Sequence, residues 1–307
     1  MKIDCSKILK HWREERGLNQ SKFAELLNCD PKRISLLETG KQKLDIWQLM
    51  EMAQPLGILT EDLWLLFLTV EEYKDYEMYR HLKRLLRDEE HKEAKQVFDK
   101  LKTGELAKNT FLRQFIAYVE IKLDFEIQPE QAIGKIYDAL HVTKPDFDES
   151  KIVEYHLNYN EICLIVALGS QYSKQKKSER AIDLNKAIID SRENIKATED
   201  DKAMLYPSLM FNICNLLGRV ERYEESLEYC RMALKVCREY NNLRLVPQIL
   251  YNMATGYQLI GEEEKIYKPY LVRAYHTAYG IGALRRAAKI KKDAEVHFGI
   301  TSIGMYD

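Results

Sequence analysis

The sequence lacks the short motifs that mark many enzymes and metal proteins. Its seven histidines form no H-E-x-x-H spacing, and its six cysteines form no C-x-x-C pair. A P-loop and a G-x-S-x-G nucleophile elbow are absent as well. We therefore expect a protein that is not an enzyme, with no catalytic residue, no metal site and no cofactor.

The sequence also has little of what a secreted or membrane protein needs. We expect no signal peptide, because Lys2 and Asp4 precede an already charged helix, and the strongly apolar run at residues 63–70 is far too short to span a bilayer. The scattered cysteines are expected to be reduced, small apolar residues. These features predict a cytoplasmic protein with no membrane partner.

Composition predicts a soluble globular chain with about two domains. Hydrophobic residues make up 46% of the 307 residues and charged residues 31%, with a formal net charge of −1. The charge is uneven, because residues 2–43 hold ten Lys or Arg against six Asp or Glu. A local positive excess of this kind is what contact with phosphates requires.

Residues 18–40 read as two short helices joined by a tight turn. Asn19 is expected to cap the first helix and Asp30 the second, with Pro31 at the first helical position, where no N–H is needed. Ile34 and Leu37 are expected to point inward. Lys32, Arg33, Ser35 and Leu36 are left on the outer face, which is the arrangement of a DNA-binding helix-turn-helix.

These residues resemble the helix-turn-helix regulators related to phage repressors, the Xre type. The matching marks are Gln20, Ala24, Ile34, Leu37 and the Glu38-x-Gly40 ending. Asn28 stands where that family usually has glycine, and asparagine tolerates the left-handed conformation needed there. The resemblance implies that Arg13 pairs with Glu38 and braces the DNA-reading helix.

A five-helix DNA-binding domain is expected over residues 1–68, with helices at residues 5–16, after Asn19, after Asp30, after Asp45 and after Thr60. Base edges or nearby phosphates would be contacted from the second helix of the motif. The expected DNA contacts are Gln20, Lys32, Arg33, Ser35, Leu36, Thr39, Lys41 and Lys43.

From Glu71 onward the sequence shows no strand-like alternation and reads as helix after helix, and residues 69–307 are expected to form a second domain. Breaks are expected near residues 103–104, 128–129, 144–145, 173–178, 197–200, 220–222, 241–242, 261 and 280–282. Helices joined by short turns over more than two hundred residues favour an all-α chain that ends in a solenoid of helix pairs.

Three weak copies of a repeat lie in this region, starting at Tyr159, Phe211 and Tyr251. Their small and aromatic positions are similar to those of tetratricopeptide (TPR) repeats. Each copy carries an aromatic–asparagine pair: Tyr159-Asn160, Phe211-Asn212 and Tyr251-Asn252. A primary amide can pair with both the C=O and the N–H of an extended peptide. Alternatively, the three asparagines hydrogen-bond between adjacent helices.

A helix-turn-helix followed by degenerate TPRs resembles the RRNPP group of bacterial peptide-pheromone receptors, of the PlcR, PrgX and Rgg type. The resemblance implies quorum sensing, in which a short signalling peptide binds the concave groove and changes DNA binding, with peptide contacts from the three aromatic–asparagine pairs. Two alternatives remain open. One is a regulator controlled by a protein partner, and the other is a TPR signalling protein that acts by phosphatase activity or sequestration.

A homodimer on a palindromic double-stranded DNA operator is expected, because two related motifs read both halves of a palindrome. Candidate contact surfaces are the run Trp64–Leu68 and the C-terminal residues Ala283, Leu284, Ala287 and Ala288. The alternative is that these residues belong to the core of one chain.

Overall fold

The computed structural model describes residues 6–59, 62, 65, 68–301 and 303. Within these residues the regular elements are helices, and an isolated bridge joins Asn158 to Lys196. The all-α prediction is therefore confirmed. The chain divides into two compact units, Met1–Ile116 and Ala117–Asp307, each described by itself below. The domain boundary expected between residues 68 and 69 stays a prediction.

The helices of the first unit begin where the sequence places their caps. Asn19 Oδ1 accepts a hydrogen bond from Lys22 N at 2.8 Å, and Asp30 Oδ1 accepts one from Lys32 N at 2.7 Å. Asp45 forms a reciprocal capping box with Gln48. The elements are α1 (Ser6–Glu15), α2 (Gln20–Leu26), α3 (Pro31–Glu38), α4 (Ile46–Ala53), α5 (Val70–Arg87), α6 (His91–Leu101), η2 (Leu106–Lys108) and α7 (Thr110–Leu123), which runs on into the second unit.

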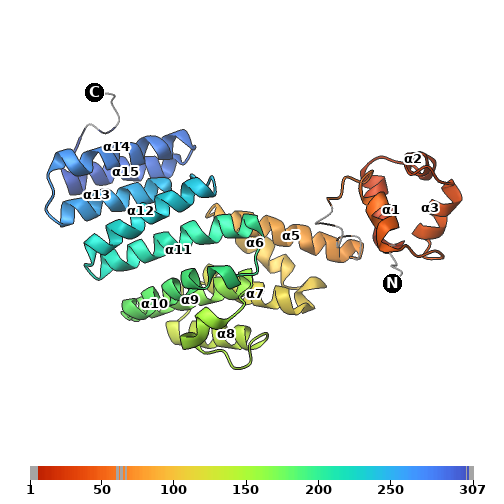
Figure 1. Ribbon diagram of the computed structural model, residues 1–307, viewed down its shortest axis with the longest axis horizontal. Coiled ribbons are helices and arrows are strands. Elements are labelled where there is room, and N and C mark those ends of the chain that lie inside the picture. The colour runs from red at the N-terminus through yellow and green to blue at the C-terminus, as the bar shows by residue number, and fades with distance from the viewer. Residues whose placement is uncertain (1–5, 60–61, 63–64, 66–67, 302, 304–307) are drawn as a thin grey trace. The chain divides into compact units, whose positions relative to one another are not determined.

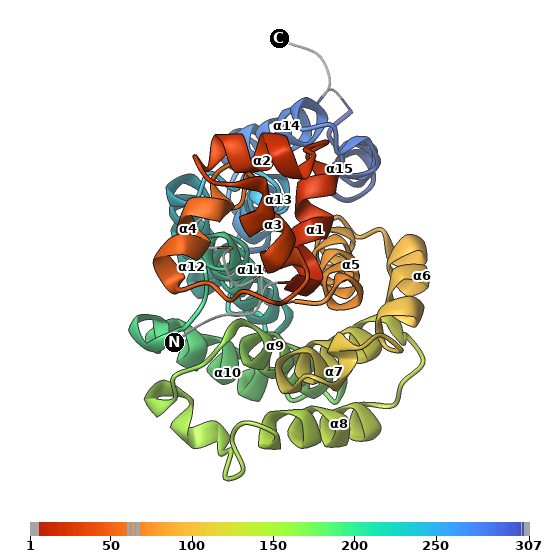
Figure 2. The ribbon, with the colours of Figure 1, turned by 90° about the vertical axis from the view of Figure 1, so that its right-hand side faces the viewer.

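The helix-turn-helix is held by one apolar cluster, to which Ile8, Phe23, Ile34 and Leu37 contribute buried side chains. Asn28 has φ of 47°, so it adopts the left-handed conformation expected at the turn between α2 and α3. Figure 2 shows α1 to α4 facing the viewer. The helix start expected at Thr60 lies outside the described residues.

The second unit is a succession of helices packed on their neighbours in the chain (Figure 1). Helices α9–α10, α11–α12 and α13–α14 are the three repeat copies that the sequence predicts, and the expected breaks fall between helices. The elements are α8 (Pro129–His141), η3 (Glu149–Glu154), α9 (Tyr159–Lys174), α10 (Ser178–Asp190), η4 (Arg192–Asn194), α11 (Glu199–Arg219), α12 (Tyr223–Glu239), α13 (Val246–Leu259), α14 (Glu264–Gly280) and α15 (Leu284–Phe298).

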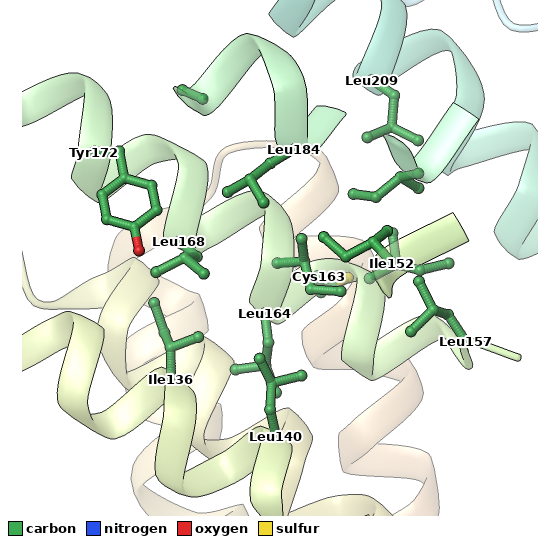
Figure 3. Close-up of a cluster of buried hydrophobic side chains, with 14 of the residues drawn as sticks. Ile136, Leu140, Ile152, Leu157, Cys163, Leu164, Leu168, Tyr172, Leu184 and Leu209 are labelled. Carbon is green, nitrogen blue, oxygen red and sulfur yellow. The ribbon is translucent and has the colours of Figure 1, made fainter. Parts of the chain in front are cut away.

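Small residues let the paired helices approach closely, as TPR packing requires. Ala181, Ala233 and Ala274 are fully buried. A Cβ on Gly256 of α13 would lie 3.0 Å from Leu227 Cδ2 of α12. Larger side chains fill the rest of the core, as Figure 3 shows for Leu164 and the residues around it.

The long connection between α8 and α9 is braced by Glu149 in η3. Its carboxylate accepts hydrogen bonds from Tyr172 OH at 2.6 Å and from Arg180 Nε at 2.9 Å, and also from Tyr137 OH. Burial raises the pKa of the Glu149 carboxyl, but the hydrogen bonds from Arg180 and the two tyrosines outweigh it and hold the pKa below its ordinary value. The brace fixes a segment that has little regular structure.

The described part of the chain has neither a bilayer-spanning helix nor a cluster of metal-ligating side chains. No helix there is long and apolar enough to cross a bilayer. No three His, Cys, Asp or Glu side chains among the described residues come together as metal ligands do.

Candidate DNA-binding and ligand-binding sites

The outer face of α3 carries the side chains that the sequence assigns to DNA contact. Ile34 and Leu37 are 0% and 1% exposed, so the opposite side of the helix faces solvent. Lys32 is exposed at the start of α3, and Arg33, Ser35 and Leu36 are half-buried. Lys41 and Lys43 are exposed on the loop that follows α3. This face therefore consists of α3 and the loop after it, and both carry positively charged side chains.

A buried ion pair holds α3 against the rest of the motif. Arg13 Nε donates to Glu38 Oε1 at 2.5 Å, and the two side chains are only 6% and 3% exposed. The hydrogen bond to Glu38 raises the pKa of the Arg13 guanidinium above its ordinary value, against the effect of burial. The predicted Arg13–Glu38 pair is present in the structure, at the end of α3.

Gln20 and Thr39 are partly engaged within the same unit. Gln20 Nε2 donates to Glu38 Oε2 at 2.8 Å, and Thr39 Oγ1 donates to Ser35 O at 2.8 Å. If Gln20 and Thr39 contact phosphates, they must do so with hydrogen-bonding groups that are not used in these two bonds. Lys32, Arg33, Lys41 and Lys43 are the cations of this face.

The second unit contains a hollow of about 330 Å³ between α9, α10 and α11. Its wall carries three asparagines, two serines and two cations beside apolar surface. The lining residues are Val166, Gly169, Ser170, Ser173, Lys174, Asn185, Asn212, Asn215, Leu216 and Arg219. The hollow has the size of a site that holds part of a small ligand.

The three predicted asparagines have three different environments. Asn212 lines the hollow, and its amide has no hydrogen-bond partner among the described residues. Asn252 Nδ2 donates to Asn215 Oδ1 at 2.7 Å and so links α13 to α11. Asn160 is 0% exposed within α9. The structure places only Asn212 of the three against the hollow, and Asn252 has the inter-helix bond that the alternative reading describes.

The aromatic partners of these asparagines pack into the helical core. Tyr159, Phe211 and Tyr251 are half-buried, and each packs against a buried apolar cluster. The ring of Tyr251 lies 6.0 Å from that of Phe298, centroid to centroid. Burial raises the pKa of the Tyr159 phenol well above its ordinary value. These contacts give the three rings a structural role in the repeats.

Two asparagines of the hollow were not predicted from the sequence. Asn215 follows Asn212 by three residues, so both lie on one face of α11, and this helical spacing was a signal that sequence analysis could have used. Asn185 is on α10 and lines the hollow beside Gly169 of α9. A Cβ there would lie 3.4 Å from Asn185 Nδ2. That approach has no local sequence signal.

The fold and the two sites define a helix-turn-helix protein with a TPR-like helical repeat domain. A model of the RNPP family C-terminal domain matches residues 79–284, and a helix-turn-helix model matches residues 9–64. The first match covers more than half of the chain, and the chain belongs to the RNPP family.

Known structures share this fold at low sequence identity. PlcR of Bacillus thuringiensis, solved with the peptide PapR7 and DNA, has a TM-score of 0.73 at 19% identity, and the match covers 96% of this chain and 99% of that one. ComR of S. thermophilus, solved with DNA and its signalling peptide ComS, has a TM-score of 0.62 at 15% identity, covering 96% and 100%. The pheromone receptor Rgg2 of Streptococcus dysgalactiae has a TM-score of 0.56 at 13% identity, covering 96% and 99%. No curated relative matches the sequence.

Proposed function

We propose that the chain is a DNA-binding transcriptional regulator that works in quorum sensing. A short signalling peptide binds its TPR-like unit and changes its binding to DNA. The structures of PlcR and ComR with both a peptide and DNA support this function for a chain of the same fold. The observation that carries the proposal is an amide-lined hollow in a helical repeat, in a chain whose helix-turn-helix has a cationic outer face.

The hollow suits a peptide backbone because its amides offer both donors and acceptors. Asn212 has no partner among the described residues, so both ends of its amide remain for a ligand. A peptide bound there changes DNA binding only if it binds two conformations of the protein with different affinity. The regulatory effect is thus a property of the equilibrium between those conformations.

We expect Asn212→Ala to weaken peptide binding about five- to hundredfold, because a peptide group loses its partner in a partly dry site. The melting temperature should stay unchanged, since the Asn212 amide bonds no described residue. Asn160→Ala is the matched variant from the same repeat position. Because the Asn160 side chain is fully buried, Asn160→Ala should lower the melting temperature. The affinity of each folded molecule for the peptide should stay unchanged. Isothermal calorimetry and thermal unfolding of both variants check this, and the reverse pattern would place the peptide elsewhere.

We expect Lys41→Ala and Lys43→Ala each to weaken binding to all DNA sequences. Both lysines are exposed on the loop after α3, where they would neutralise phosphates. Each substitution should lower the slope of log affinity against log salt by about one unit. Fluorescence anisotropy over a salt series measures the slope, and unchanged slopes in both variants would rule out the phosphate contacts.

A homodimer is part of the proposal, with two motifs reading the halves of a palindrome. Leu65 is buried, and Leu68 is half-buried, whereas Trp64, Leu66 and Phe67 lie outside the described residues. On α15, Ala287 belongs to the core, while Leu284 and Ala288 are exposed, and Ala283, just before the helix, is half-buried. The outward residues of α15 are the part of the expected surface that is open for contact with a second chain.

The function is tested by screening the purified protein against synthetic short peptides encoded near its gene. One of these peptides should bind and should shift the affinity for an operator fragment in a mobility-shift assay. Binding of operator DNA with no response to any peptide would favour control by a protein partner. Failure to bind any DNA fragment would favour a TPR signalling protein that acts by phosphatase activity or sequestration.

A further inference from the structure

The hollow of the second unit carries charge of one sign. Lys174 at the end of α9 and Arg219 at the end of α11 both line it, and no Asp or Glu of the described residues does. Arg219 Nη1 donates to Ser173 Oγ at 3.0 Å, which holds the guanidinium beside α9. Neither cation forms an ion pair within the described part of the chain. Two cations are thus left without a counter-charge at one small site.

Much of the hydrogen-bonding capacity that remains on the wall is for donation, although Ser170 Oγ donates to Val166 O at 3.2 Å and is left as an acceptor. Asn215 Oδ1 already accepts from Asn252, so its N–H groups are the part of the amide that remains. Ser173 Oγ accepts from Arg219, which leaves its own hydrogen to donate. A carboxylate accepts several hydrogen bonds and carries the charge that offsets Lys174 and Arg219.

Asn185 gives a second, independent sign of a ligand. Its side chain is 2% exposed, and Nδ2 donates to Ala181 O at 2.7 Å. Its Oδ1 is buried and has no hydrogen-bond partner in the described residues. A buried acceptor without a partner is uncommon in folded proteins, and an N–H from a ligand would satisfy it. Asn185 lines the hollow, where such an N–H would arrive.

We propose that this hollow is a carboxylate-binding subsite for the signalling peptide. Arg219 and Lys174 pair with a carboxylate of the peptide, while Asn185 Oδ1 accepts a hydrogen bond from one of its N–H groups. The inference rests on the proposed function and adds the chemistry of the ligand, since an acidic group is required at this position. The carboxylate is either the C-terminus of the peptide or an acidic side chain.

The test uses three equimolar mixtures of synthetic heptapeptides, built from the same neutral residues. The first has a free C-terminal carboxylate, the second has an amidated C-terminus and one Asp or Glu, and the third is amidated and carries no acid. Affinity selection with mass spectrometry measures how much of each mixture the full-length protein retains. Wild-type protein should retain at least one carboxylate-bearing mixture about tenfold more than the neutral one, as expected for charge-assisted bonds.

Arg219→Gln and Lys174→Gln should each reduce that enrichment while retaining the neutral mixture as the wild type does. Lys176→Gln is the matched control, because Lys176 is an exposed lysine two residues from Lys174 that does not line the hollow. Both test positions are exposed, so all three variants should keep the wild-type circular dichroism spectrum.

The outcomes separate the possible sources of the carboxylate. Enrichment of the first mixture alone assigns the subsite to the peptide C-terminus, and enrichment of the second alone assigns it to an acidic side chain. Equal retention of all three mixtures would overturn the carboxylate subsite while leaving peptide binding intact. Retention of no mixture above an unrelated protein would overturn the subsite and the proposed function together.

Discussion

Glu38→Ala is expected to destabilise the first unit by about 3–5 kcal/mol, the usual cost of leaving a buried charge without its partner. Glu38 accepts hydrogen bonds from Arg13 Nε at 2.5 Å, Arg13 Nη2 at 3.2 Å and Gln20 Nε2 at 2.8 Å. Removing the carboxylate leaves the Arg13 guanidinium, now 6% exposed, with only the half-exposed Glu14 carboxylate at 3.5 Å as a counter-charge among the described residues. Because this network holds the end of α3, DNA affinity should fall as the unit unfolds.

Tryptophan fluorescence during urea denaturation measures this effect selectively. All three tryptophans of the chain, Trp12, Trp47 and Trp64, lie within the first unit. The control is Glu38→Gln, which keeps one acceptor for Arg13 and should lose less stability than the alanine variant. A fluorescence midpoint equal to that of the wild type in Glu38→Ala would show that the pair contributes nothing to stability.

Glu161→Ala should have an effect of similar size in the second unit, again about 3–5 kcal/mol. Glu161 is the third residue of α9, and its side chain is 2% exposed. It accepts from Asn158 N at 2.8 Å and from Thr143 Oγ1 at 2.5 Å, and it pairs with Lys144 at 3.4 Å. One carboxylate therefore caps α9 and fixes the segment after α8, and alanine replaces none of these contacts.

Far-UV circular dichroism detects the loss in the Glu161→Ala variant, while its tryptophan transition should match that of the wild type. The two alanine variants are thus each other's controls, because each weakens a different unit. Glu161→Gln should recover part of the loss by restoring an acceptor for Asn158 N. A tryptophan transition that shifts as much as the dichroism would show that the two units do not unfold separately.

The helix starts were predictable because their chemistry is local. Asn19, Asp30 and Asp45 accept hydrogen bonds from backbone groups two or three residues away, so a few letters of sequence contain the whole interaction. The spacing of Ile34 and Leu37 was enough to predict that both are buried, because residues three apart lie on the same face of a helix. The helix-turn-helix could therefore be read almost completely.

The turn between α5 and α6 was not predicted. It lies at residues 88–90, where Glu89 adopts φ of 64° and the sequence holds neither glycine nor proline nor asparagine. A glutamate in the left-handed region costs roughly 1–2 kcal/mol, so packing of the two helices imposes the conformation against the preference of the residue. No local pattern contains that information.

The groove asparagines show a different limit of sequence analysis. Asn160, Asn212 and Asn252 occupy similar places in their repeats, yet one is fully buried, one lines the hollow and one bonds an amide on the neighbouring helix. What separates them is the side chains that adjacent helices bring to the same spot. Spacing within one helix predicts a face, whereas exposure on that face depends on residues far away in the sequence.

The helices of the second unit pack mainly on their neighbours in the chain, and this affects how its stability should be described. In such an array the free energy is approximately a sum of terms for single repeats and for adjacent pairs. A peptide held between α9, α10 and α11 would add its binding energy only to the terms for these helices. The stability of α14 and α15 would then increase only through their packing on α12 and α13. Cooperativity then decreases with distance from the ligand, and a single melting temperature does not define the stability of the whole array.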